Sequence, residues 1–492
     1  MRRCETLIRG AMVVDGSGDE PFAADVAITA GVISLVGRDA LLLAGELVDG
    51  TGLVLAPGFI DVHTHDDTNV VRAPEMWPKL SQGVTTVIVG NCGISAAPAR
   101  LTGELPDPMN LLGNRDAFVY PDFASYVNAL ERACPAVNVA ALVGHTTLRN
   151  NHMDRLDRPA TAEEIDAMRA ELRDALARGA LGLSTGLAYA SAFSAPTEEV
   201  MALAEPLAEA GGIYTTHMRT EFAEILSAMD EAFRIGRHAR VPVVISHLKC
   251  AGPENWGRSI EVLEALDAAS LTQSIGWDCY PYTAGSSTLD LKQVTDQIEI
   301  TITWSEPHPE VARNSLKDIA TGWGVSLLDA AGRLQPAGAI YHSMSEDDVR
   351  RILRHPSTVI GSDGLPNDPM PHPRLWGAFP RVLGKYCRDE KLFSLPEAVH
   401  KMTGLPAQRF GLTGRGFVRE GYAADLVLFD AATVRDVATF DDSQRPAEGI
   451  LAVWVNGVLS SRGQIPTGAR GGRYVPRGVI AGSGVTPEWL AT

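Results

Sequence analysis

The sequence predicts an α/β protein, a closed (β/α)8 barrel of the TIM type with a small β-sandwich domain formed from the N- and C-terminal segments. Eight short apolar runs, rich in β-branched residues, recur between about residues 57 and 362. Runs that are apolar throughout are typical of strands buried on both faces of a parallel sheet. Amphipathic helical stretches separate several of these runs. Both flanks of the chain instead alternate short strand-like pieces with turn signals, a pattern typical of antiparallel β-structure.

The eight runs follow one another in steps of about 30 residues, which is enough for a strand and a helix. One intervening stretch has clear helix signals, because Thr161 with Glu164 forms a capping box and Gly179 is a plausible end. Eight such units favour a closed barrel. An open doubly wound sheet stays the alternative, since the number of strands does not by itself exclude it. The runs are PGFIDV, GVTTVIVG, AVNVAALVG, GALGLSTG, GGIYTTH, VPVVISH, SIGWDCYPY and STVIGSD, starting at residues 57, 83, 136, 179, 211, 241, 274 and 357.

Two intervals between runs are longer than the others, at residues 93–136 and 283–356. Long connections on a barrel usually decorate the catalytic face, where the strands end. We therefore expect a lid insertion at 283–356 within a barrel domain of residues 55–414. Residues 1–54 and 415–492 are too short to form separate sheets and are expected to share the small domain, because chain termini often lie close together.

Composition and charge exclude several classes of protein. The 492 residues include 43 Lys plus Arg against 60 Asp plus Glu, a formal net charge of −17, with 45% hydrophobic and 21% charged residues. This composition predicts a globular protein. It contains no cluster of cations that would bind nucleic acid or anionic lipid.

The first apolar stretch ends at Asp15, too early for a signal peptide, and no run approaches the length of a membrane span. We therefore expect a cytoplasmic protein with no membrane partner. The six cysteines form no CxxC pair, so their even number does not imply disulfides in this compartment.

His63 and His65 follow the first run as Asp61-Val62-His63-Thr64-His65. Side chains two apart on a strand point to the same side, so both imidazoles are expected to converge at the barrel mouth. A single histidine is more often structural than functional. A pair at a strand end is a better signal for a metal site.

Other strand ends carry further candidate ligands. Cys92, His217, His247 and Asp363 follow or end the second, fifth, sixth and eighth runs. Taken singly, Cys92 could be an inert buried thiol and Asp363 a turn or helix cap. Together they lie at one end of the predicted barrel. Thiolate, imidazole and carboxylate form the ligand set of zinc, and three protein ligands with an open position mark a catalytic site.

The segment GFIDVHTHDD resembles the opening motif of the amidohydrolase superfamily. With VTTVIVGNCGIS, YTTHMRTE, VVISHLK, DCYPYTAGSS and IGSDGLP, almost the whole chain resembles the N-acyl-D-amino-acid deacylase (D-aminoacylase) family. The cysteine-bearing GNCGIS segment is more specific than the HxH pair. Many amidohydrolases bridge two metals with a carboxylated lysine at the fourth strand. The fourth run here, LGLSTGLAY, has no lysine, and the family pattern places Cys92 in the bridging position.

The resemblance implies one tightly held Zn²⁺ on Cys92, His217 and His247. A second, weaker site would use His63, His65 and Asp363 and share Cys92. The implied reaction is hydrolysis of the amide bond of an N-acyl-D-amino acid to a carboxylate and a free D-amino acid. Hydroxide on the metal would attack, and Asp363 would serve as general base and then as general acid.

The resemblance also implies a set of substrate contacts. Lys249 lies two residues past His247 and, with Tyr280, is expected to hold the substrate's α-carboxylate. Ala188 stands where the family has a bulkier aromatic residue, so the side-chain pocket is expected to be enlarged and to favour neutral, apolar D-amino acids. Lys292 is the nearest candidate cation for an acidic side chain. The other expected contacts are Tyr189, Ser286, Arg374, Tyr341 and Met344.

Three alternatives stay open. The first is an N-acyl-D-glutamate or N-acyl-D-aspartate deacylase, which Lys292 would favour. The second is a cyclic-amide hydrolase of the hydantoinase or dihydroorotase kind, against which Cys92 and the missing bridging lysine argue. The third is a non-enzymatic scaffold, against which the intact ligand set argues, because buried charged groups without a partner are costly to retain.

Overall fold

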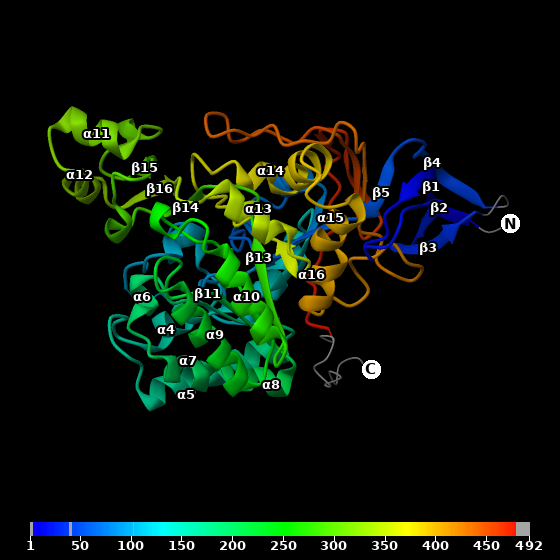
Figure 1. Ribbon diagram of the computed structural model, residues 1–492. Helices are drawn as coiled ribbons and strands as arrows, with labels where there is room; N and C mark the ends of the chain where they lie inside the picture. The colour runs from blue at the N-terminus through cyan, green and yellow to red at the C-terminus, as the bar shows by residue number, and fades with distance from the viewer. Residues whose placement is uncertain (1–2, 39–41, 102, 479–492) are drawn as a thin grey trace.

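A barrel of parallel strands forms the centre of the computed structural model, which describes residues 3–38, 42–101 and 103–478 (Figure 1). Every residue of these strands except His217 is buried, as expected where both faces of a parallel sheet are covered. The barrel strands are β6 (Phe59–Asp61), β7 (Val84–Val89), β8 (Asn138–Ala141), β9 (Val143–Gly144), β10 (Gly182–Gly186), β11 (Ile213–His217), β12 (Val243–Ile245), β13 (Ile275–Cys279) and β17 (Thr358–Ile360).

The strands pair in two groups, β6-β7-β8 and β9-β10-β11-β12-β13-β17. The groups join at Leu142, between β8 and β9, whose N–H donates to the carbonyl of Val89 at 2.9 Å. At the other seam Thr64 forms a parallel bridge with Gly364, and the Asp363 N–H donates to the carbonyl of His63 at 2.8 Å. The predicted closed barrel is therefore confirmed over the open sheet.

Helices surround the barrel and bury their apolar faces against its strands. The predicted capping box is present at the start of α5, where Thr161 and Glu164 bond reciprocally. No helix within the described residues combines the length and apolar character needed to cross a membrane. The helices outside the insertion are α1 (Asn69–Arg72), α2 (Trp77–Leu80), α3 (Phe123–Ala133), α4 (His145–His152), α5 (Ala162–Ala177), α6 (Ala190–Phe193), α7 (Thr197–Ala204), α8 (Pro206–Ala210), α9 (Ile225–Ala239), α10 (Ser259–Ser270), α13 (Glu346–Arg354), α14 (Arg374–Arg381), α15 (Leu395–Met402) and α16 (Gly404–Arg409).

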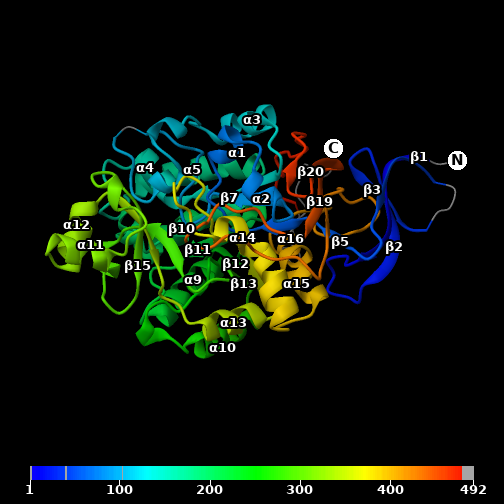
Figure 2. The same ribbon diagram turned by 90° about the horizontal axis from the view of Figure 1, so that it is seen from above.

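Strands from both ends of the chain form one nine-stranded sheet beside the barrel (Figure 2). The two ends meet where β5 pairs antiparallel with β18, and apolar residues of both halves share one buried cluster. The small domain is thus built from both termini, as predicted. Its strands are β1 (Arg3–Val13), β2 (Phe22–Thr29), β3 (Val32–Gly37), β4 (Leu43–Asp49), β5 (Val54–Pro57), β18 (Leu426–Phe429), β19 (Ile450–Val455), β20 (Val458–Arg462) and β21 (Ile465–Pro466).

Strand pairing differs from the predicted domain limits at two places. β5 lies in the small sheet, so the sheet continues to Pro57 and past the expected limit at residue 54. After β21 the chain returns to the barrel, where Tyr474 bridges Val139 and Arg477 donates to the carbonyl of Leu176 at 3.2 Å. Residues 479–492, also assigned to the small domain, lie outside the described residues.

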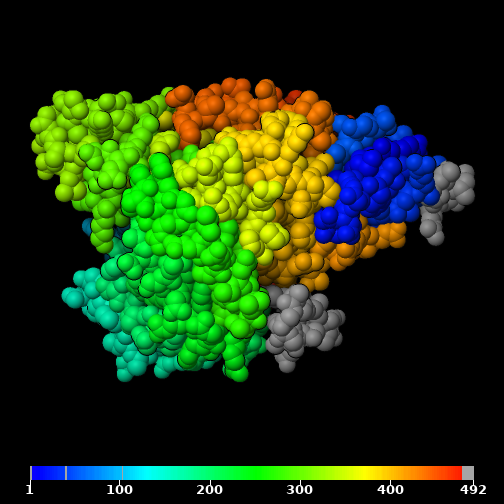
Figure 3. All heavy atoms as spheres, in the orientation of Figure 1, coloured from blue at the N-terminus to red at the C-terminus, as the bar shows by residue number. Residues whose placement is uncertain are grey.

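The long connection after β13 forms a separate lobe on the side of the barrel opposite the small sheet (Figure 3). Its elements are the antiparallel strands β14 (Gly285–Thr288), β15 (Ile300–Ser305) and β16 (Ala337–Tyr341) and the helices α11 (Leu316–Trp323) and α12 (Leu327–Leu334), packed around a hydrophobic cluster of their own. The lobe is shorter than the predicted range 283–356. Helix α13 belongs to the barrel, because its buried face of Val349, Ile352 and Leu353 lies in the barrel core.

Candidate metal centre

All six predicted ligand residues lie at the carboxyl end of the barrel strands. Parallel register aligns neighbouring strand ends, for example Gly186 and His217, the last residues of β10 and β11. Five of the six side chains are buried, and that of His217 is 14% exposed. The positions at strand ends that the sequence indicated therefore become one cluster in space.

Cys92 lies at the centre of this cluster. Its Sγ is 3.2 Å from His63 Nε2 and 3.4 Å from His247 Nε2, and the latter atom is 3.1 Å from His217 Nδ1. Ligands of a tetrahedral zinc ion lie about 2.0–2.3 Å from the metal and so roughly 3.3–3.6 Å from one another. The thiol of Cys92 and the imidazoles of His63 and His247 lie at nearly this spacing and fit zinc, and His217 adjoins them through His247.

A second group of donors adjoins the first. Asp363 Oδ1 lies 3.2 Å from His65 Nε2 and 3.5 Å from His63 Nε2. Because His63 also contacts Cys92, the two groups share a border at the thiol. Two imidazoles and a carboxylate are also a donor set that fits a divalent ion.

The backbone is strained at three of these residues. Cys92, His247 and Asp363 have φ values of 53°, 37° and 51°, a region that residues other than glycine seldom adopt. Such conformations gather at functional sites, where the surrounding structure enforces them. Next to Cys92, a Cβ on Gly93 would lie 2.6 Å from the Gly186 nitrogen, so glycine is required there.

Opposite charges hold the thiol and the carboxyl group in their ionised forms. Burial would raise the pKa of Cys92, but the imidazoles of His63 and His247 outweigh it and hold the pKa well below its ordinary value. Burial would likewise raise the pKa of Asp363, and the charges of Arg374 and His63 hold it well below its ordinary value. Both shifts favour the anionic forms, which a metal ligand or a general base requires.

Two carboxylates that bond the cluster histidines are not among the residues predicted from the sequence. Asp278 Oδ2 lies 3.2 Å from His63 Nδ1, and its Oδ1 accepts the backbone N–H of His247 at 2.9 Å. Glu221 Oε1 lies 2.8 Å from His247 Nδ1. Asp278 was detectable, because it lies two residues before Tyr280 at the same strand end; Glu221 is in a loop and carries no such periodic signal.

Arg374, Tyr280, Lys249 and Ser286 gather beside Asp363. Arg374 Nη1 lies 2.9 Å from Asp363 Oδ2, and Nη2 donates to the Ser286 carbonyl at 3.1 Å. The Arg374 guanidinium and the Lys249 ammonium lie 4.6 and 5.8 Å from the centre of the Tyr280 ring. The buried hydroxyls of Tyr280 and Ser286 have no hydrogen-bond partner within the described part of the chain.

The remaining expected substrate contacts are more dispersed. The Tyr189 ring packs edge-on against His217 at 4.9 Å between centroids. The Tyr341 hydroxyl is engaged inside the insertion, where it donates to the Thr288 carbonyl at 3.0 Å. Met344 is buried in the barrel core cluster, and Lys292 Nζ lies 4.8 Å above the ring of Phe193. The roles of Tyr341 and Met344 in a side-chain pocket stay predictions.

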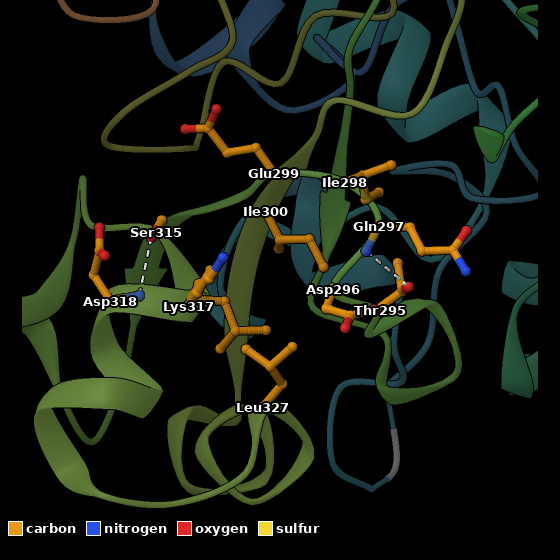
Figure 4. Close-up of a pocket in the computed structure, with 11 residues that line it drawn as sticks. Thr295, Asp296, Gln297, Ile298, Glu299, Ile300, Ser315, Lys317, Asp318 and Leu327 are labelled. Atoms are coloured by element: carbon orange, nitrogen blue, oxygen red, sulfur yellow. Dashed lines mark hydrogen bonds between the residues drawn. The ribbon is translucent and has the colours of Figure 1, made fainter.

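A separate cavity of about 450 Å³ lies within the insertion (Figure 4). It contains none of the predicted site residues. Its walls mix polar, charged and apolar side chains. Two hydrogen bonds join lining residues to one another, from the Asp318 N–H to Ser315 Oγ and from the Gln297 N–H to Thr295 Oγ1. The lining comprises residues 295–300, 315–318 and 327. The candidate chemistry is therefore at the barrel mouth and not in this cavity.

Lys79 on α2 ties the first and last barrel strands together beneath the cluster. Its ammonium group, fully buried, lies 2.8 Å from Asp61 Oδ2, 3.2 Å from Asp66 Oδ2 and 2.9 Å from Ser362 Oγ. Burial alone would lower the pKa of Lys79, but the charges of Asp61 and Asp66 hold it above its ordinary value. The lysine thus fixes the segments that lead to His63 and Asp363.

Replacing Lys79 with methionine is expected to lower the free energy of unfolding by about 3–5 kcal/mol, because two buried carboxylates lose their counterion. Urea denaturation of the variant measures the loss. Lys317→Met, at an exposed lysine of the insertion, is the control and should leave the urea midpoint unchanged. If Lys79→Met and the control had the same urea midpoint, Lys79 would not stabilise the contact between the first and last barrel strands.

The chain matches the amidohydrolase family over residues 46–460 and belongs to that family. It is 49% identical to the D-aminoacylase of Alcaligenes xylosoxydans xylosoxydans, covering 96% of this chain and 98% of that protein. It is 46% identical to the N-acyl-D-aspartate deacylase of the same organism, covering 99% and 96%. The crystal structure of an N-acyl-D-glutamate deacylase from Bordetella bronchiseptica, complexed with zinc and a phosphonate inhibitor that mimics the tetrahedral intermediate, is 43% identical with a TM-score of 0.93, covering 96% and 100%.

Proposed function

We propose that the protein is a zinc-dependent deacylase that hydrolyses N-acyl-D-amino acids to a carboxylate and a free D-amino acid. The observation that carries the proposal is the cluster of Cys92, His217 and His247 beside Asp363. The three relatives described above are a D-aminoacylase and deacylases of N-acyl-D-aspartate and N-acyl-D-glutamate. The thiol-centred donor set also distinguishes the site from cyclic-amide hydrolases that use a bridging lysine. An intact, buried ligand set argues against a non-enzymatic scaffold.

We assign the tight zinc to Cys92, His217 and His247 and a weaker second site to His63, His65 and Asp363. When bound, zinc lowers the pKa of water and polarises the scissile carbonyl. Asp363, anionic at neutral pH, takes the proton of the attacking water and delivers it to the leaving amine nitrogen. Its ion pair with Arg374 holds the carboxylate at the border between the metal ligands and the substrate side of the site.

Lys249, Arg374, Tyr280 and Ser286 are the proposed contacts of the substrate's α-carboxylate. Two cations lie there with two hydroxyls that have no partner among the described residues, and an anion accepting their hydrogen bonds would satisfy the buried donors. Tyr189 is proposed to line the same space beside His217.

Replacing Lys249 with alanine should raise KM for an N-acetyl-D-amino acid by about 10- to 100-fold, the effect of losing a charge-assisted hydrogen bond of about 1.5–3 kcal/mol. Steady-state kinetics should be compared on the same amide without its carboxylate, which serves as the internal control. An equal change in KM for both substrates would refute the carboxylate role.

The substrate side chain is proposed to be neutral. Lys292, the candidate cation for an acidic side chain, lies over the Phe193 ring, and the residue before Tyr189 is the small Ala188. The alternative is a D-glutamate or D-aspartate substrate, as in two of the relatives.

The deciding experiment is an amine-release assay on paired D and L N-acetyl amino acids with apolar, aromatic and acidic side chains, with a hydantoin included. We expect turnover of the neutral D compounds. Preference for acidic D compounds would favour the alternative, and turnover of the hydantoin alone would contradict the deacylase assignment.

We further propose a cytoplasmic location, which is supported by the six free cysteines. Cell fractionation tests this location.

A further inference from the structure

One buried carboxylate contacts three of the side chains at the barrel mouth. Glu221 Oε1 lies 2.8 Å from His247 Nδ1 and 2.5 Å from Lys249 Nζ, and Glu221 Oε2 lies 4.0 Å from His217 Nε2. The residue is 7% exposed. Its loop is held in place because the Ala251 N–H donates to the Glu221 carbonyl at 2.9 Å. Glu221 therefore occupies a fixed position between the proposed zinc ligands and the proposed carboxylate contact.

The contact with Glu221 determines which nitrogen of His247 carries a proton. An ionised carboxylate only accepts hydrogen bonds, so His247 Nδ1 donates to Glu221 and the lone pair of His247 is on Nε2. That nitrogen faces Cys92 Sγ at 3.4 Å. His217 is arranged the other way round, since its Nδ1 faces His247 Nε2 at 3.1 Å and its Nε2 faces Glu221. His247 Nδ1 and His217 Nε2, the nitrogens that point away from Cys92, therefore both face Glu221.

Glu221 also orients Lys249. An ammonium group has three donors, and two of those on Lys249 are directed at Glu221 Oε1 and, at 3.1 Å, at the carbonyl of His247. The ammonium group is thereby anchored at the mouth, 5.8 Å from the centre of the Tyr280 ring. Without Glu221, Lys249 Nζ, 2.8 Å from His247 Nδ1, would donate to that nitrogen and move the ring proton to Nε2, which faces Cys92.

We infer that Glu221 is a positioning residue that fixes the tautomer and ring orientation of His247, attracts the neighbouring His217 ring by its charge and, at the same time, holds the ammonium group of Lys249. The inference rests on the proposed function, since it assumes that these histidines hold zinc and that Lys249 binds substrate. A single carboxylate then couples the affinity for metal to the affinity for the substrate anion. Removing a residue that hydrogen-bonds to a metal ligand typically weakens metal binding by about 10- to 100-fold.

The test compares Glu221→Ala and Glu221→Gln with the wild-type protein. The metal-free proteins are titrated with zinc against a competing chelator, and KM is measured separately with zinc at saturation. We expect the zinc Kd of Glu221→Ala to rise about 10- to 100-fold and its KM to rise as well. In Glu221→Gln the amide oxygen still accepts from His247 Nδ1, so the rise in Kd should be smaller. Glu231→Gln is the matched control, because Glu231 is also buried and pairs with Arg219 at 2.8 Å.

A zinc Kd that stays at the wild-type value in both variants would overturn the inference, even if their melting temperatures fall, because a purely structural role moves stability alone. If Glu221→Ala does not fold, the isosteric Glu221→Gln decides the question by the same comparison. A wild-type protein that binds no zinc tightly would contradict the proposed function instead, so the two failures are distinguishable.

Discussion

Replacing Asp363 with asparagine is expected to lower kcat by about 10²- to 10⁴-fold, the usual contribution of a general acid-base group. The amide keeps the shape of the side chain and can still bond His65 and Arg374, but it cannot take up a proton. The tight zinc should stay bound, since Cys92, His217 and His247 are unchanged. Single-turnover kinetics with metal analysis of the same sample measures both quantities.

Asp368→Asn provides a matched control for this prediction. Asp368 lies in the same loop, is also buried and bonds Thr303 Oγ1 at 2.7 Å without contacting the cluster. It should keep nearly full turnover. If Asp363→Asn retained the activity of this control, Asp363 would have to be removed from the proton transfer.

Replacing Cys92 with serine is expected to remove tight zinc binding and activity together. Its thiol lies between both groups of histidines, and their charges favour the thiolate that zinc prefers over a hydroxyl group. The loss of zinc affinity should exceed the roughly 10- to 100-fold loss caused by removing a residue that only hydrogen-bonds to a ligand. Chelator competition gives the Kd of the variant.

Cys4→Ser, at a buried cysteine in β1 of the small sheet, is the control for Cys92→Ser. It should bind zinc as tightly as the wild-type protein. If Cys92→Ser and Cys4→Ser bound zinc with equal affinity, the Cys92 thiol would be excluded as a ligand. The histidines of the cluster would then bind zinc without it.

The barrel was predictable because its strands are buried on both faces and so appear as continuous apolar runs. Five of the cluster residues follow a strand and one ends a strand, which is why strand periodicity found them. The insertion was harder to delimit. The predicted lid, residues 283–356, fills the whole interval between two apolar runs and so includes α13. The apolar face of that helix, with Val349 and Ile352, packs in the barrel.

Most supporting contacts of the site were not predictable in this way, although the place of Asp278 at a strand end was. Lys79 meets Ser362, and His63 meets Asp278, across more than two hundred residues of sequence. Glu221 lies in a loop, where side-chain direction follows no period. Such pairs are set by tertiary packing and leave no local pattern, so the sequence indicates the ligands more readily than the groups that hold them.

The pairing of β5 with β18 also orders events during synthesis of the chain. All the barrel strands lie between Pro57 and Leu426, so at about 5–20 residues per second the partner of β5 is made roughly 20–70 s later. During that time one edge of β5 has unpaired N–H and C=O groups, which are a template for pairing with other chains. The small sheet is therefore completed last, and the newly made protein is most exposed to aggregation through its first strands.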